Sequence, residues 1–373
     1  MEAPVMISEF RRQHSWLVIL ACCGWLVPST LSLTSPIAAP IVSPSVVFIG
    51  GLGYCGGRIA RSIREAYPDC IIVGSVRSKE RRAELLSNQG EGRDLAYNDV
   101  YVLDLDDGYT GLNNAGQASL ASATHIIQTV APIADHNQDP LLALHGDLLR
   151  QRKGVNPLCW VGYLSSTGVY GDHHGAWVTE DESSELRCVD AKSLARIEAE
   201  WQWRQLEKAS GQGIRVDCFR CGGIYGPGRG PLFSTVNDLR LSSDSSLLDQ
   251  TPKYVNRILV DDIAGAMLAA MSSDRPLHNG RVYNLVDDNP APRRDVILEA
   301  RKLRGLVDGS DANDNGAAAT FTGRSRPPTR STGNKRCCNQ RLKDEYGWKL
   351  TAPTYKEGLA FLYEQEYVFR GSA

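Results

Sequence analysis

The sequence predicts an α/β fold in which a doubly wound parallel sheet is followed by a smaller C-terminal lobe. Two observations predict this fold. Short apolar runs typical of buried parallel strands alternate with segments of helical periodicity from residue 46 to about residue 226. A glycine-rich turn, GGLGYCGG, joins the first apolar run to the first helical segment. Such alternation produces parallel strands with helices on both faces of the sheet.

The expected elements follow in a regular order. The first strand is Val46–Ile49, and the helical segment after it is Arg58–Ala66. Further strands are expected at Cys70–Val76, Val100–Asp107, Thr124–Pro132, Cys159–Ser166 and Ile214–Gly226. Helices are expected at 80–86, 139–151 and 192–210. Beyond residue 226 we expect a strand running into a helix over 257–271, a strand at 281–288 and a helix at 293–305.

The N-terminal segment, residues 1–44, differs from the rest of the chain. No acidic residue occurs between Glu9 and Glu65, and a hydroxyl-rich stretch follows the apolar run Trp16–Val27. That run is shorter than a membrane-spanning helix requires and suits the core of a targeting signal. We expect a targeting presequence, with an organelle as destination and a plastid favoured. Secretion and an uncleaved membrane anchor are the alternatives.

The remainder is expected to form a dinucleotide-binding domain at 45–225 and a C-terminal substrate lobe at 226–373. Within the lobe, residues 309–336 are rich in Gly, Asn, Ser, Thr and Pro, and they predict a flexible loop with a basic run from Arg324 to Arg336. The formal net charge is −2, with 23% charged and 42% hydrophobic residues. This composition excludes a bulk electrostatic footprint for nucleic acid, so we expect no DNA partner, and we favour a solvated segment over an RNA contact for the basic run.

The cysteines do not predict a metal or redox site. The pair Cys218-x-x-Cys221 lies in an expected strand, where positions three apart face opposite sides of the sheet. The two thiols would therefore not converge on one ion. His173 and His174 stand beside acidic residues in an expected loop, and a solvated turn accounts for them.

The glycine turn carries the dinucleotide pattern Gly51-x-Gly53-x-x-Gly56, preceded by Gly50. In this pattern the first glycine allows a tight turn, the second lets the backbone approach a pyrophosphate, and the third lets helix and strand pack closely. The free N–H groups at the start of the helix favour the phosphates. The position of the turn on the first strand predicts a Rossmann-type fold, and a purely structural turn is the alternative.

The second strand predicts which dinucleotide binds. It ends in GSVRSKERR, with Ser75, Arg77 and Ser78 where an NAD site would place an acidic residue. A guanidinium matches the geometry of a 2′-phosphate. We therefore expect NADP, with NAD left open. The alternative is that Arg77 is only a surface residue.

Several segments together resemble the extended short-chain dehydrogenases/reductases, the NAD-dependent epimerase/dehydratase-like group. They are the glycine turn, VLDLDD, LSSTGVYGD, CGGIYGPG and RILVDDIAGAM, and they cover Val46 to about Asp288. The resemblance implies that Asp104 lies near the adenine. It implies that the remaining cofactor contacts come from Gly50, Gly51, Gly53, Tyr54, Cys55, Gly56, Arg77, Thr129, Val130 and Ala131.

The same resemblance implies a catalytic hydroxyl at Ser166, with Thr167 as the neighbour that could share its work. The family also uses a Tyr-x-x-x-Lys pair on the next helix, and this chain has Lys192 and Arg196 at those positions. Arg196 can still bind a ribose hydroxyl or a phosphate, but it keeps its charge permanently. Lys192 could transfer protons only if its pKa were depressed.

Tyr163 and Tyr170, on and just past the expected strand, are alternative phenols that could reach the pocket, with Tyr170 a candidate catalytic residue, although neither is in the family's place. Arg257 is about two residues off the register of a substrate-phosphate arginine, so no sugar-nucleotide substrate is carried over.

Two functions remain open from the sequence. The first is an NADP-dependent oxidoreductase or epimerase-like enzyme that acts on an unknown small hydroxy or carbonyl substrate. The second is a non-catalytic NAD(P)-binding regulator, or an assembly or RNA-associated factor, which the missing Tyr-Lys pair motivates. A homodimer is also left open, since related folds often dimerise through the helices after the fourth and fifth strands.

Overall fold

The computed structural model describes residues 45–87, 96–105, 109–133, 138–152, 157–181, 185–209, 213–234, 252–276, 280–306 and 333–368. All of them belong to one unit, residues 38–373. The expected presequence, residues 1–44, and residues 309–332 of the expected loop lie outside the described residues. None of the helices in these ranges has the length and apolarity that crossing a membrane requires.

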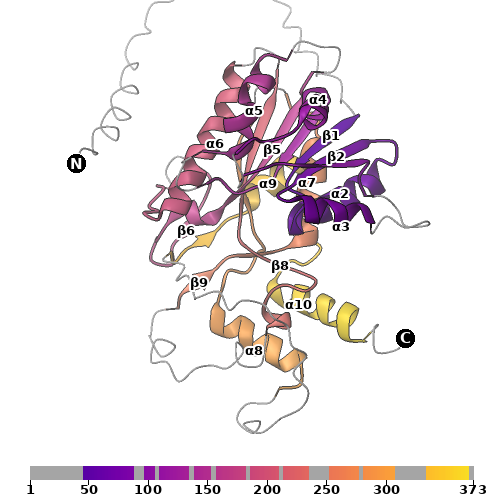
Figure 1. Ribbon diagram of the computed structural model, residues 1–373. Coiled ribbons are helices and arrows are strands. Elements are labelled where there is room, and N and C mark those ends of the chain that lie inside the picture. The colour runs from indigo at the N-terminus through magenta and orange to yellow at the C-terminus, as the bar shows by residue number, and fades with distance from the viewer. Residues whose placement is uncertain are drawn as a thin grey trace, which may run out of the picture. The chain divides into compact units, whose positions relative to one another are not determined.

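Seven strands of the described residues form a parallel central sheet in the order β11-β7-β5-β4-β1-β2-β3 (Figure 1). Their bounds are β1 Val46–Gly50, β2 Ile71–Val76, β3 Asp99–Val102, β4 His125–Gln128, β5 Trp160–Ser166, β7 Arg215–Cys221 and β11 Val282–Leu285. The chain runs outward from β1 to β3 and then crosses to β4 on the other side of β1. The sheet is therefore doubly wound, as predicted, and such folds bind ligands at this switch point.

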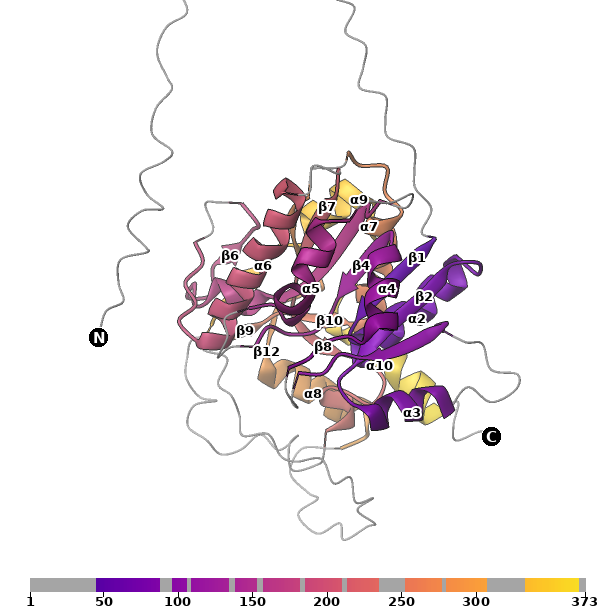
Figure 2. The same ribbon diagram turned by 45° about the horizontal axis from the view of Figure 1, so that its top comes forward.

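Helices cover both faces of the sheet (Figure 2). On one face lie α2 (Tyr54–Ala66), α3 (Lys79–Ser87), α7 (Val260–Met271) and α9 (Gln340–Tyr346). On the other lie α4 (Asn114–Ser122), α5 (Pro140–Arg150) and α6 (Ala191–Ala209). Alternate residues of each strand serve opposite cores: Cys218 packs with the second group and Cys221 with the first, as the strand reading of this pair predicted.

The C-terminal part adds smaller elements beyond the carboxyl ends of the strands. Short ladders join β8 (Gly223–Tyr225) to β10 (Arg257–Leu259), β9 (Tyr254–Val255) to β12 (Ala291–Pro292), and β6 (Trp177–Val178) to β13 (Arg336–Cys337). Helices α8 (Arg293–Leu303) and α10 (Tyr355–Tyr363) pack around Tyr225 and Leu232 in a separate core. Single turns occur at η1 (Thr167–Tyr170), η2 (Pro231–Phe233) and η4 (Glu364–Val368).

The structure corrects several expected boundaries. Residues 226–373 are not a separate lobe throughout, because β11 extends the central sheet and α7 packs on α2. The expected strand Ile214–Gly226 divides at Gly222, where a Cβ would lie 2.9 Å from the Asn256 carbonyl, so β8 turns away to pair with β10. The third and fourth strands end at Val102 and Gln128, before the expected Asp107 and Pro132.

The expected flexible loop 309–336 also extends too far, because residues 333–336 are part of the described structure. Arg336 begins β13, and its guanidinium lies over the rings of Trp177 and Tyr254. Lys335 is 4% exposed. These two members of the basic run are therefore packed against the domain, whereas Arg324, Arg326 and Arg330 lie outside the described residues.

Candidate functional site

The glycine turn is held tightly between β1, β2 and β4. Gly51 has a φ of +92°, which favours glycine, and its N–H donates to the Ser75 hydroxyl at 3.1 Å. The Thr129 hydroxyl donates to the carbonyl oxygens of Gly50 and Gly51 at 3.0 and 2.8 Å. A Cβ at Gly56 would lie 2.0 Å from the Gly51 carbonyl oxygen, so only glycine lets α2 approach the turn this closely.

Gly53 differs from these glycines because its Cβ position faces open space. Apart from Gly53 and its two chain neighbours, no atom lies within 4 Å of it, and Gly53 is the N-cap of α2. The first turn of α2 contains no acidic residue. The N–H groups at the start of the helix and the positive end of its dipole therefore face a space whose described lining residues include no acidic side chain. This arrangement fits the pyrophosphate of a dinucleotide.

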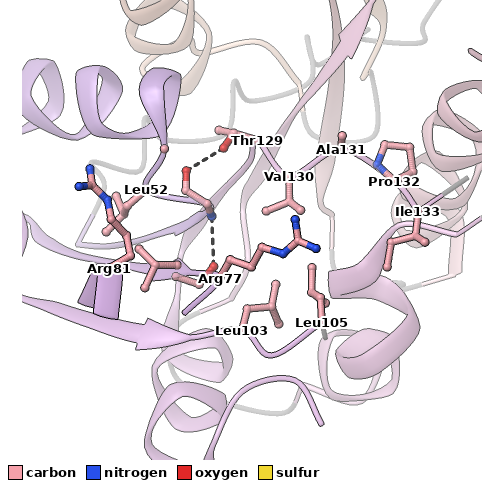
Figure 3. Close-up of a pocket in the computed structure, with 14 residues that line it drawn as sticks. Leu52, Arg77, Arg81, Leu103, Leu105, Thr129, Val130, Ala131, Pro132 and Ile133 are labelled. Atoms are coloured by element: carbon pink, nitrogen blue, oxygen red, sulfur yellow. Dashed lines mark hydrogen bonds between the residues drawn. The ribbon is translucent and has the colours of Figure 1, made fainter. Parts of the chain in front are cut away.

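A cavity of about 670 Å³ opens beside the turn at the switch point (Figure 3). Six of the predicted cofactor contacts line it: Gly51, Gly53, Arg77, Thr129, Val130 and Ala131. The Arg77 side chain extends across the cavity towards Val130, and Arg81 stands at its other side. Arg81 was not among the residues expected from the sequence, although it lies in the same basic stretch, SVRSKERR.

The other predicted cofactor contacts lie around this cavity and not on its wall. Asp104 lines a neighbouring cavity of about 1050 Å³ that shares Arg77, and its carboxylate accepts a hydrogen bond from Thr110 at 3.3 Å. Gly50 and Gly56 shape the turn from behind. Tyr54 donates to the Pro227 carbonyl oxygen at 3.2 Å, and burial raises its pKa to about 12. Burial also raises the pKa of Cys55.

A second cavity, of about 710 Å³, lies beyond the carboxyl ends of β5 and β7. It brings together four predicted catalytic residues, Ser166, Thr167, Lys192 and Arg196. The Ser166 hydroxyl accepts from the Gly168 N–H at 3.1 Å, and the Thr167 hydroxyl donates to the Cys221 carbonyl oxygen at 3.4 Å. The Ser166 hydroxyl is thus oriented by η1, and its proton is not committed to a partner among the described residues.

The start of α6 forms another wall of this cavity. The Asp190 carboxylate accepts from the Ser193 N–H at 3.0 Å, which caps the helix, and this bond contributes to a lowered pKa of Asp190. Lys192 is exposed, and Arg196 is half-buried one turn further on. The guanidinium of Arg196 donates to the Lys192 carbonyl oxygen at 3.2 Å. The side chains that stand in the place of the Tyr-Lys pair therefore both reach the cavity.

The structure does not bring either alternative phenol into the second cavity. Tyr170 is fully buried in η1: its hydroxyl donates to Asn284 at 2.9 Å, and the Arg220 guanidinium lies over its ring. Burial raises the pKa of Tyr170 further from neutrality. Tyr163 is fully buried against Trp203. The expectation that Tyr170 reaches the pocket is therefore wrong, because η1 turns its ring into the core.

Sequence reasoning missed several residues of the second cavity, notably Ser193, Tyr254, Asn256 and Lys335. Ser193 directly follows Lys192 on the same expected helix, so the sequence could have indicated it as a lining residue. No local sequence pattern indicated Lys335 as a site residue, because the segment around it has the composition of a loop. It reaches the cavity through contacts between distant segments, which are the pairing of β13 with β6 and a hydrogen bond from the Asn256 side chain to the Lys335 carbonyl oxygen. Among the described residues, no group of three His, Cys, Asp or Glu side chains is arranged to hold a metal ion.

The fold and its glycine turn place the chain among the Rossmann-type α/β proteins. More specifically, the chain belongs to the NAD dependent epimerase/dehydratase family, whose family model matches residues 46–285. Comparison with curated proteins gives no match.

Several solved structures are similar in fold to this chain. A functionally unknown conserved protein from Silicibacter pomeroyi is 30% identical, with a TM-score of 0.64 over 87% of this chain and 99% of its own. The dTDP-glucose 4,6-dehydratase of Bacillus anthracis, solved with NAD, is 15% identical, with a TM-score of 0.57 over 87% and 98%. The UDP-glucuronic acid 4-epimerase of Bacillus cereus, also with NAD, is 14% identical, with a TM-score of 0.58 over 87% and 98%. At these identities the last two show the fold alone.

Proposed function

We propose that this protein is an NAD(P)-dependent oxidoreductase or epimerase that acts on a small substrate with a hydroxyl or carbonyl group. One observation carries the proposal. The cavity at the glycine turn and the cavity at Ser166 follow the carboxyl ends of adjacent strands, since β1, β4, β5 and β7 are neighbours in the sheet. A dinucleotide in the first cavity can therefore point its reactive end towards a substrate in the second.

The backbone of Gly51–Gly53 and the start of α2 would hold the pyrophosphate, and residues 129–131 would line the path towards β5. When bound, the nicotinamide supplies hydride transfer at a carbon that bears oxygen. Ser166 would bind that oxygen through its uncommitted proton and orient the carbon, with Thr167 beside it on the same cavity. The proton would move through Lys192 or water, because Tyr170 is buried away from the cavity.

We favour NADP over NAD as the cofactor. Both Arg77 and Arg81 line the first cavity, and none of its described lining residues is acidic. An NAD site would use a carboxylate for the ribose 2′-hydroxyl, whereas a guanidinium suits a 2′-phosphate. The two solved relatives with NAD show that the family fold accepts the other dinucleotide as well.

Calorimetry of NADPH and NADH binding to the full chain tests the cofactor. We expect NADPH to bind more tightly, and Arg77→Ala to weaken NADPH by about tenfold or more while NADH changes little. Arg61→Ala, at an exposed arginine of α2 that lines neither cavity, is the matched control. Equal affinities would refute the phosphate preference. If neither dinucleotide binds, the glycines form only a turn and the proposed function fails.

Oxidation of NADPH in the presence of a panel of small carbonyl compounds tests the reaction. Ser166→Ala should abolish any turnover found and leave NADPH affinity within about twofold, because its hydroxyl faces the second cavity. A parallel fall in NADPH affinity would mean that Ser166 serves the cofactor and not the substrate. Tight binding without turnover on any substrate would favour the non-catalytic regulator.

A further inference from the structure

Lys335 is a buried cation at the second cavity that the proposed reaction does not use. The residue is 4% exposed, and its ammonium donates to the Gly171 carbonyl oxygen at 3.1 Å. It lies on the segment that leads into β13, which the pairing with β6 fixes against the domain. The position is therefore built into the fold and does not depend on a mobile surface side chain.

Among the described residues, this ammonium forms no ion pair with a carboxylate. It has three N–H donors, and the described residues supply one acceptor. The nearby carboxylates have other partners: Asp172 accepts from the backbone N–H groups of His174 and Asn334, and Asp190 accepts from that of Ser193. Neither forms an ion pair with Lys335 among the described residues. Burial lowers the pKa of Lys335, as expected for a charge that is poorly paired.

Two further cations line the same cavity. Lys192 and Arg196 stand on the first two turns of α6, and no ion pair of the described residues engages either side chain. Asp190 is the one acidic residue among the described lining residues. The positive end of the α6 dipole adds to the field of the three cations. The described lining residues of the cavity therefore carry an excess of positive charge.

We propose that the second cavity binds an anionic group of the substrate, a carboxylate or a phosphate, held by Lys335, Lys192 and Arg196. The proposal rests on the proposed function, because it assigns the chemistry of the same substrate site. An arginine fork and an ammonium are the side chains that bind such oxygens most strongly. An anion would also supply the acceptors that the buried ammonium lacks.

The proposal specifies the substrate class. With Ser166 and Thr167 on the same cavity, the reacting oxygen and the anionic group must both fit within about 710 Å³. The substrate is then a small hydroxy or oxo compound that carries a carboxylate or a phosphate. Lys335 selects it by charge, so a neutral analogue of the same shape should bind much more weakly.

Calorimetry with two probes, inorganic phosphate and malonate, tests the anion site on the full chain. We expect at least one probe to bind, and Lys335→Met to weaken it by about tenfold or more because a charge-assisted hydrogen bond is lost. Lys335→Arg, which keeps the charge, should retain more of the affinity than Lys335→Met. Lys356→Met, at an exposed lysine of α10, is the matched control and should bind as the wild type does.

The two probes also distinguish whether the anionic group of the substrate is a carboxylate or a phosphate. Binding of malonate alone assigns a carboxylate, and binding of phosphate alone assigns a phosphate. Failure of both probes to bind the wild-type protein overturns the proposal. Equal affinity of the wild type and Lys335→Met also overturns it, because the cavity then holds an adventitious ion only.

NADPH binding, measured on the same samples, keeps this test separate from that of the proposed function. The first cavity contains none of the three cations, so each variant should bind NADPH with wild-type affinity if it is folded. Anion binding without NADPH binding would refute the dinucleotide function but still support the anion site. NADPH binding without anion binding would support the dinucleotide site and refute the anion site.

Discussion

The hydroxyl of Ser75 accepts a hydrogen bond of 3.1 Å from the backbone N–H of Gly51. The Ser75 carbonyl oxygen also accepts from the N–H of Leu52 at 2.6 Å. Ser75 lies on β2 and is fully buried, so both bonds join the glycine turn to the strand beside it in a water-free place. The turn is therefore held in one conformation by a residue 24 positions away.

Ser75→Ala should loosen the turn. Loss of one buried hydrogen bond costs about 1 kcal/mol, so we expect the Kd for NADPH to rise about fivefold. Ser87→Ala, at the exposed end of α3, is the control and should change nothing. Isothermal calorimetry measures the NADPH affinity, and chemical unfolding measures the stability of the fold. Lower stability with unchanged affinity would show that Ser75 supports the fold alone.

Gly53→Ala should block the cofactor without harming the fold. The φ of Gly53 is −86°, and an added Cβ meets no atom of the protein within 4 Å. The methyl group would instead fill the space that the pyrophosphate needs, so we expect about tenfold weaker NADPH binding or more at unchanged Tm. Gly57→Ala also enters open space, one helical turn further along α2, and should bind normally. Wild-type affinity of Gly53→Ala would place the phosphates elsewhere.

Glu200 of α6 and Arg220 of β7 form a buried ion pair. Their oxygen and nitrogen are 2.7 Å apart, and Ser165 donates to the same carboxylate at 2.5 Å. Glu200→Ala leaves the Arg220 charge buried and unpaired, so we expect a loss of about 3–5 kcal/mol in the free energy of unfolding. Asp147→Ala breaks the exposed pair with Arg150 and should cost less than about 1 kcal/mol. Equal losses in urea denaturation would contradict this ranking.

His125 should make the protein less stable in mild acid. It is buried on β4, and burial lowers its pKa to about 4 from an ordinary value of 6.5. Between pH 6.5 and pH 4, His125 is protonated in the unfolded chain but neutral in the folded protein. The free energy of unfolding therefore falls by up to about 3 kcal/mol as the pH drops from 6.5 to 4. His125→Gln should show a shallower pH dependence of the unfolding free energy. His174→Asn, at an exposed histidine, controls for the loss of a histidine.

The glycine turn and its flanking elements could be predicted because their signals are local. Four apolar residues, a glycine pattern and Ile59 and Ile63 at helical spacing are enough to define a strand, a turn and a helix. Arg77 was found in the same way, since it follows the second strand directly, whereas Thr129 was expected because of the family resemblance. The sequence could place them on one edge because parallel strands end together.

Tyr170 shows where this reasoning stops. Its position just after β5 predicted a place in the pocket, but the turn of η1 rotates the ring towards Asn284 and Arg220. Those partners stand on β11 and β7, at least 50 residues further along the chain. A sequence pattern reports which elements form, whereas the direction of a side chain beyond a strand depends on neighbours that the pattern does not include.

The sequence by itself determined the doubly wound sheet, the glycine turn and the edge at which the candidate residues gather, because hydrophobic periodicity and glycine geometry act over a few residues. Only the tertiary structure decided which side chains share the second cavity. Lys335 meets Gly171 across 164 positions of sequence, through the pairing of β13 with β6. That contact depends on packing between distant segments, and no local pattern encodes it.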